Sequence, residues 1–147
     1  MADILHRIGV VAPLDDVYLA LVDVDGLAAW WTTDTVGTKE VGGKLAFRFG
    51  ELGGFDMEIV HLDPTGKVRW LVVDGPEEWI GTEIDWSLDQ RAEFTIVQFR
   101  HEGWREQVEF MGHCSTKWAT FLMSLKQHIE TGAGRPWPND VIISDWH

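Results

Sequence analysis

Six histidines and one cysteine are the residues of this chain whose side chains could act as bases, nucleophiles or metal ligands. Zinc sites need histidine and cysteine clustered at short spacings, and the chain has neither an HExxH motif nor a second cysteine. A cysteine nucleophile needs a base aimed at it, whereas on a helix His113 would project about 100° away from Cys114. The sequence therefore assigns no catalytic residue, no metal site and no cofactor, and it predicts a buried, inert thiol at Cys114.

Paired carboxylates are a second possible source of chemistry, because two acids held close together can share acid and base roles. Here they fall on the polar faces of expected strands, with basic residues on the neighbouring strands. Cross-strand ion pairs on a solvated sheet face explain this pattern more simply than catalysis does. The residues concerned are Asp56 and Glu58, and Glu83 and Asp85, with Arg48, Lys67 and Arg69 as the bases.

Composition limits the function classes further. The 24 acidic and 12 basic residues give a net charge of −12, which argues against partners such as nucleic acid or an anionic membrane surface. The single cysteine allows no internal disulfide, and neither a secretory leader nor a run of 18 apolar residues is present, so we expect a cytoplasmic protein. Nine tryptophans in 147 residues indicate wide apolar walls, around either a packed core or a cavity.

Hydrophobic periodicity supplies the elements. Residues 3–11 alternate as a strand would, and two short helices follow, the first opened by Pro13 and the second spanning residues 27–31. After a loop over residues 32–43, hydrophobic residues recur at every second position, which predicts about five strands. From residue 105 to 131 the period becomes helical, and Gly132 and Gly134 end the helix. This order predicts an α+β domain over residues 1–134, whose curved antiparallel sheet of about six strands wraps the long C-terminal helix. Residues 135–147 form a tail packed on the domain or extending from it.

Several segments resemble the helix-grip fold of the START/Bet v 1-like superfamily. More narrowly, they resemble the family named after the C-terminal domain of the activator of Hsp90 ATPase, which includes bacterial single-domain members. The resemblance covers residues 3–134 and is specific for fold rather than for activity. It rests on residues 17–21, on Gly26 to Thr32 with the pair Trp30-Trp31, on residues 81–84 and 95–99, on His101 to Trp104, and on Cys114, Trp118, 121–122, 124–126 and 130–132.

The resemblance implies a central cavity between the sheet and the long helix, although the same apolar stripe would also suit a solid core. Small residues at mid-helix, Cys114 and Ser115, are places where room could remain beside large aromatics. Gln98 interrupts an apolar strand face, where a polar amide needs a partner such as a ligand or another protein group. The expected ligand-binding residues are Trp30, Trp31, Phe47, Phe49, Trp70, Trp86, Ile96, Gln98, Met111, Ser115 and Trp118.

The leading hypothesis is intracellular binding of an apolar or amphipathic small molecule in that cavity. A cyclase- or dehydratase-type enzyme, as some relatives of the fold are, is an alternative and would use Gln98, Arg100 or His101. A third hypothesis is a protein-interaction module, with a homodimer or an Hsp90-type chaperone as partner. The family name implies the chaperone, but the eukaryotic co-chaperone's additional N-terminal chaperone-binding domain has no counterpart within these 147 residues.

Overall fold

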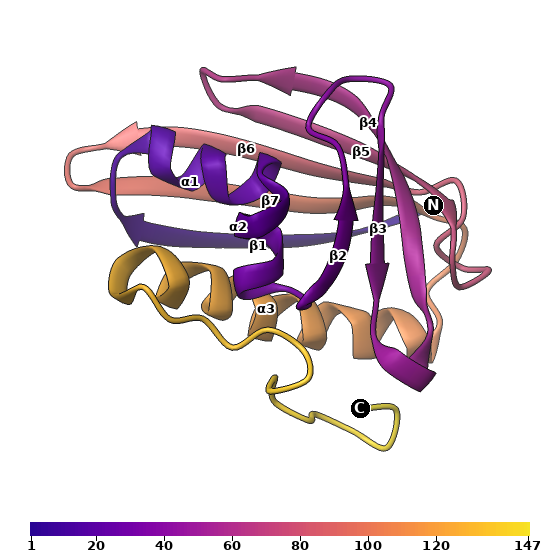
Figure 1. Cartoon of the computed structure of the whole chain (residues 1–147). Coiled ribbons are helices and arrows are strands. Elements are labelled where there is room, and N and C mark those ends of the chain that lie inside the picture. Colours follow the sequence, from indigo (N-terminus) through magenta and orange to yellow (C-terminus); the bar gives the residue numbers. More distant parts are fainter.

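The structure is a computed structural model that describes all 147 residues, and it confirms the α+β helix-grip architecture (Figure 1). The chain forms seven strands, two short helices, one 3₁₀ turn and one long helix. In order they are β1 (Ala2–Val11), α1 (Leu14–Val22), α2 (Val24–Trp30), β2 (Asp34–Gly37), β3 (Lys44–Arg48), η1 (Gly50–Leu52), β4 (Gly54–Asp63), β5 (Lys67–Asp74), β6 (Glu83–Arg91), β7 (Phe94–Trp104) and α3 (Glu109–Thr131).

All neighbouring strands are antiparallel, in the order β1-β7-β6-β5-β4-β3-β2. Figure 1 shows the sheet bending over α3, with α1 and α2 beside it and the C-terminal segment (yellow) running back along α3. Two boundaries differ from the sequence-based expectation. The seventh strand, β2, lies in the stretch expected to be a loop, and α3 begins four residues later than expected. Neither helix nor strand pattern marks so short an edge strand, which forms because β3 offers it a pairing partner.

Local sequence explains where the helices begin and end. Pro13 precedes α1 with an extended backbone, and Asp15 and Asp16 lie in its first turn, where acids interact favourably with the helix dipole. Gly132 ends α3 with a φ of 85°, a left-handed conformation that glycine adopts without strain. No helix is both long enough and apolar enough to cross a membrane.

Aromatic rings fill the space between the sheet and α3. Trp118, at the middle of α3 and 2% exposed, lies with its ring 4.4 Å from that of Phe99 on β7 and 4.9 Å from that of Trp31. Trp31 in turn stacks between Trp30 and Trp70, at 5.6 and 6.1 Å. These rings tie the helix, the sheet and the turn after α2 into one apolar cluster.

One strand faces the opposite way from the sequence-based expectation. On β7, the residues that point into the core are Thr95, Val97, Phe99 and His101, so Gln98 is exposed and faces outward. Ile96 is buried on that same outer face, where its side chain comes near Gly9 of β1. The error arose because both faces of this strand carry apolar residues, so alternation alone does not say which face is inside.

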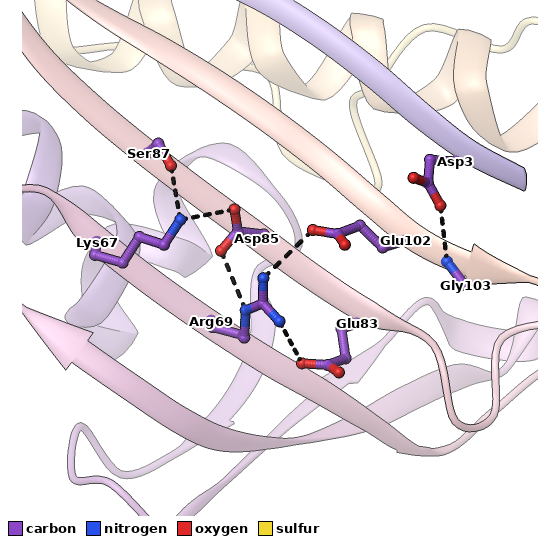
Figure 2. Close-up of polar contacts among 8 residues, drawn as sticks. All are labelled: Asp3, Lys67, Arg69, Glu83, Asp85, Ser87, Glu102 and Gly103. Atoms are coloured by element: carbon purple, nitrogen blue, oxygen red, sulfur yellow. Dashed lines mark hydrogen bonds and ion pairs between the residues drawn. The ribbon is translucent and has the colours of Figure 1, made fainter.

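The outer face of the sheet carries the expected ion pairs. Asp85 is 4% exposed and accepts hydrogen bonds from Lys67 Nζ, at 3.0 Å, and Arg69 Nε, at 3.3 Å (Figure 2). Arg69 also reaches Glu83 and Glu102, so one guanidinium joins three strands. This network has the cross-strand geometry of a stabilising cluster.

Replacing Trp118 with alanine should lower the free energy of unfolding by about 3–5 kcal/mol, because it leaves a cavity where a large buried ring was. Urea unfolding measures the loss. Trp146→Ala is the matched control, since that ring is 45% exposed, and it should change stability by less than about 1 kcal/mol. A loss for Trp118→Ala as small as the control's would contradict the assignment of Trp118 to the core.

Candidate functional site

A cavity of about 590 Å³ lies where the first half of α3 meets the ends of β3, β4 and β5. The loop after β5 and the C-terminal segment complete its wall. Here the short η1 turn joins β3 to β4, and Gly53, Gly54 and Gly75 are part of the cavity lining. Ten of its 21 lining residues are hydrophobic, so it combines apolar walls with a polar rim.

Aromatic faces make up the deep walls. Trp79, from the loop after β5, stacks on Phe55 with ring centres 4.4 Å apart and lies nearly parallel to Trp118 at 5.9 Å. Trp31 lies 5.4 Å from Phe55 on the other side. Phe49, Phe110, Phe121 and Trp146 add further rings to the lining. Such surfaces suit flat or chain-like apolar molecules, which gain free energy when they leave water.

The C-terminal segment, residues 135–147, is part of the cavity wall. Trp137 fixes it to the domain, because its N–H donates to the Trp31 carbonyl at 2.8 Å and its own carbonyl accepts from Thr33 N–H at 3.2 Å. The Trp137 ring packs edge-on against Phe49. Residues 135–147 thus contact the turn after α2 through Trp137, and the last of them reach the cavity.

A buried ion cluster holds the far end of this segment against α3. The carboxylate of Asp140, 2% exposed, pairs with Lys117 and lies 3.2 Å from His147 Nε2. His113 lies 2.8 Å from the Ser144 hydroxyl and packs against the Trp146 ring. Burial and the nearby charge of Lys117 lower the pKa of His113. Because Asp140 is shared with Lys117, the His147–Asp140 pair anchors the segment rather than forming a free acid–base pair.

A chain of buried hydrogen bonds orients the indoles behind the cavity. Trp118 Nε1–H donates to His101 Nδ1 at 3.2 Å, so the ring proton of His101 sits on Nε2 and is donated to the Thr82 hydroxyl at 2.8 Å. Thr82 donates to the Trp79 carbonyl, and Trp79 Nε1–H donates to the Cys114 sulfur at 3.4 Å. Burial lowers the pKa of His101 to about 3, so it is neutral at pH 7.

Cys114 is a buried free thiol, and its burial agrees with the sequence-based expectation. It is 4% exposed, and burial raises its pKa to about 12, although the hydrogen bond from Trp79 favours the thiolate. A thiol with this pKa supplies almost no nucleophilic thiolate at neutral pH. No group of three or more His, Cys, Asp or Glu side chains is arranged to hold a metal ion.

The residues expected to bind a ligand fall into three groups. Trp31, Phe49 and Trp118 line the cavity, whereas Trp30, Phe47, Trp70 and Trp86 lie in the solid core behind it. Met111 packs against the core outside the lining.

The other three expected residues lie elsewhere. Ile96 and Gln98 face outward on β7, as described above. Ser115 faces β1, where its hydroxyl and carbonyl both meet His6 Nε2, at 3.3 and 3.0 Å. Contrary to expectation, Ile96, Gln98 and Ser115 do not line the cavity.

Sequence reasoning missed Phe55, Trp79 and the C-terminal segment. Phe55 lies near the start of β4, and nothing in the alternation of that strand places it beside the cavity. Trp79 lies in a loop without periodicity. Of the three glycines in the lining, Gly53, Gly54 and Gly75, only Gly53 has open space where a side chain would be.

Comparison with known proteins shows the family of this chain. Residues 11–130 match the sequence model of a family described as Activator of Hsp90 ATPase homolog 1-like protein. The chain belongs to this family. This confirms the resemblance inferred from the sequence. A comparison with curated proteins finds no match.

Solved structures of similar fold agree with the family assignment. The structure of the Aha1 dimer from Colwellia psychrerythraea is 44% identical, with a TM-score of 0.85 over 91% of this chain and all of that one. CalU16 from Micromonospora echinospora is 21% identical, with a TM-score of 0.79 over 97% of this chain and 74% of that one. A Staphylococcus saprophyticus protein is 19% identical, with a TM-score of 0.76 over 90% of this chain and 95% of that one. The last two show the shared fold alone.

The buried imidazole of His101 should make this family member sensitive to acid. Its pKa is about 3 when folded and about 6.5 when unfolded, so the unfolded chain binds the extra proton first. The stability that its neutral form contributes is complete above pH 6.5 and is lost as the pH falls towards 3. Between those values the free energy of unfolding should fall by up to about 1.4 kcal/mol per pH unit because of this group alone.

Urea unfolding from pH 7 to pH 4 measures this slope. His101→Gln, whose amide can both accept from Trp118 and donate to Thr82, should have a distinctly shallower slope than the wild type. His61→Gln, at an exposed position, should keep the wild-type slope. Equal slopes in all three proteins would show that His101 does not titrate in this way.

Proposed function

We propose that this protein binds an apolar or amphipathic small molecule in the cavity between the sheet and α3. The observation that carries the proposal is the cavity itself: about 590 Å³, walled by aromatic rings from five parts of the chain. Small-molecule sites commonly enclose about 300–1,000 Å³ and combine apolar walls with a few polar groups. The solid aromatic core behind the cavity supports this use, because rigid walls need no reorganisation to receive a ligand.

The enzyme alternative has less support from the geometry. Of its candidate residues, Gln98 and Arg100 are exposed on β7, and His101 is buried with both ring nitrogens already hydrogen-bonded. None of the three lines the cavity. A general acid or base must come within hydrogen-bond reach of its substrate. Binding is therefore the better-supported function.

A protein-interaction role is the second candidate, favoured by the family description and by the 44% identical Aha1 from Colwellia psychrerythraea, which is described as a dimer. We propose that this chain also forms a homodimer. Sedimentation equilibrium should then give twice the mass of one chain, 16.7 kDa, at micromolar concentration. A chaperone-linked role would require the ATPase rate of an Hsp90-type chaperone to rise on addition of the protein, and an unchanged rate would count against it.

Filling the cavity tests the binding proposal. The wild type should bind the neutral, environment-sensitive dye prodan, seen as a blue shift and increase of its emission. Cys114→Phe places a ring at the cavity wall and should weaken this binding at least tenfold, because the ring occupies space the dye needs. Cys114→Met adds fewer atoms and should weaken binding less. Thr116→Phe, exposed on the same helix, should bind as the wild type does.

Thermal unfolding of each variant separates filling from misfolding, since overpacking a solid core costs about 1–3 kcal/mol. A Cys114→Phe protein that is clearly destabilised, together with a wild type that never binds the dye, would show that no usable cavity exists. A folded Cys114→Phe protein that binds prodan as tightly as the wild type would place the dye elsewhere.

A further inference from the structure

The rim of the cavity holds one more carboxylate than its cations can pair. Three carboxylates line it, those of Asp56, Asp74 and Asp140, together with the cations Arg48 and Lys117 and the imidazoles of His113 and His147. Arg48 is hydrogen-bonded to Asp56 at 2.8 Å, and Lys117 is paired with Asp140. The carboxylate of Asp74 makes no ion pair, and the only hydrogen bond that it accepts comes from the N–H of Gly75, at 2.9 Å.

The register of β4 and β5 adds to this excess of negative charge. Asp56 and Asp74 are directly opposite each other, and like charges in that arrangement repel. Asp34 of β2 lies opposite Arg48, so a third carboxylate acts on the same guanidinium. Burial and the charge of Lys117 lower the pKa of His113, which disfavours a positive charge on this ring of the lining.

The unpaired carboxylate and several aromatic residues line the same cavity. Asp74 is followed by Gly75, and both are part of a lining that includes Phe55. Phe55 stacks on Trp79, and both rings line the cavity. Aromatic faces attract cations through their negative π-electron density. A carboxylate beside such faces is the arrangement that recognises an organic ammonium group attached to an apolar body.

We infer that the cavity's ligand is an amphipathic organic cation, whose apolar part lies against Trp79 and Trp118 and whose ammonium group lies at the rim beside Asp74. This inference rests on the proposed binding function and names the ligand class for it. The ammonium would give the Asp74 carboxylate the ion-pair partner that it lacks.

Three probes with the same naphthalene body and different charges test the inference: 1-naphthylmethylamine, 1-naphthalenemethanol and 1-naphthylacetate. Titration calorimetry at neutral pH and low ionic strength should give tightest binding for the amine, by about five- to tenfold over the alcohol, and weakest for the carboxylate. That preference is the size expected for a charge pair partly exposed to water. High salt should reduce it, because the pair is screened.

The variant Asp74→Asn should remove most of the amine's advantage over the alcohol while leaving the affinity for the alcohol unchanged. Asp89→Asn, an identical change at an exposed position of β6 outside the cavity, should keep the full advantage. Equal affinity for amine and alcohol, tightest binding of the carboxylate, or an unchanged preference in Asp74→Asn would overturn the ammonium inference.

The dye experiment distinguishes the two proposals. One outcome is that the wild type binds prodan, that Cys114→Phe weakens this binding, and that the amine binds no more tightly than the alcohol. In that case the cavity binds ligands and the ammonium inference is wrong. If neither prodan nor any of the three probes binds, the proposed function fails, and the inference fails with it.

Discussion

The burial of indole rings, three of them oriented by hydrogen bonds from their N–H groups, is the constraint on which the rest of this structure depends. An indole contributes a large apolar surface, but a buried N–H without an acceptor costs free energy. Trp30 donates to the Ala20 carbonyl, Trp118 to His101 and Trp79 to Cys114. Each bond fixes the plane of its ring, and thereby decides which face is left for the next ring. Trp86 and Trp104 have buried N–H groups without partners, so their positions rest on packing alone.

The cavity follows from where this packing stops. Trp31 contacts rings on every side within the core, yet one edge of it reaches the cavity lining, as do Trp118 and Trp79. Beyond them the chain places glycines at the ends of β4 and β5 and a cysteine on α3, none of which fills the volume of a ring. The same residues that make the core rigid therefore also make the walls of the cavity, and a change in one ring's position would alter both.

Much of the fold could be predicted from the sequence because the period of hydrophobic residues changes from two to 3.6 at residue 105 and stays regular on either side. The inward positions on β3 and β6, such as Phe47 and Trp86, follow directly from that alternation. On β7 the alternation of apolar and polar residues does not identify the inward face. Apolar residues occupy both faces, and the residues that point inward include the polar His101. Its inward position depends on partners from two other segments, Thr82 and Trp118, which no local pattern reveals.

The cavity was harder to predict than the core for the same physical reason. A core residue is recognised by its own hydrophobicity and spacing, whereas a cavity wall is defined by what surrounds it. The C-terminal segment makes this plain: it has no periodicity, yet Trp137 fastens it to Trp31 through the backbone, and Asp140 fastens it to Lys117. Trp146 and His147 thereby become wall residues. Filling of the cavity and docking of this segment are consequently linked equilibria, because each stabilises the surface that the other uses.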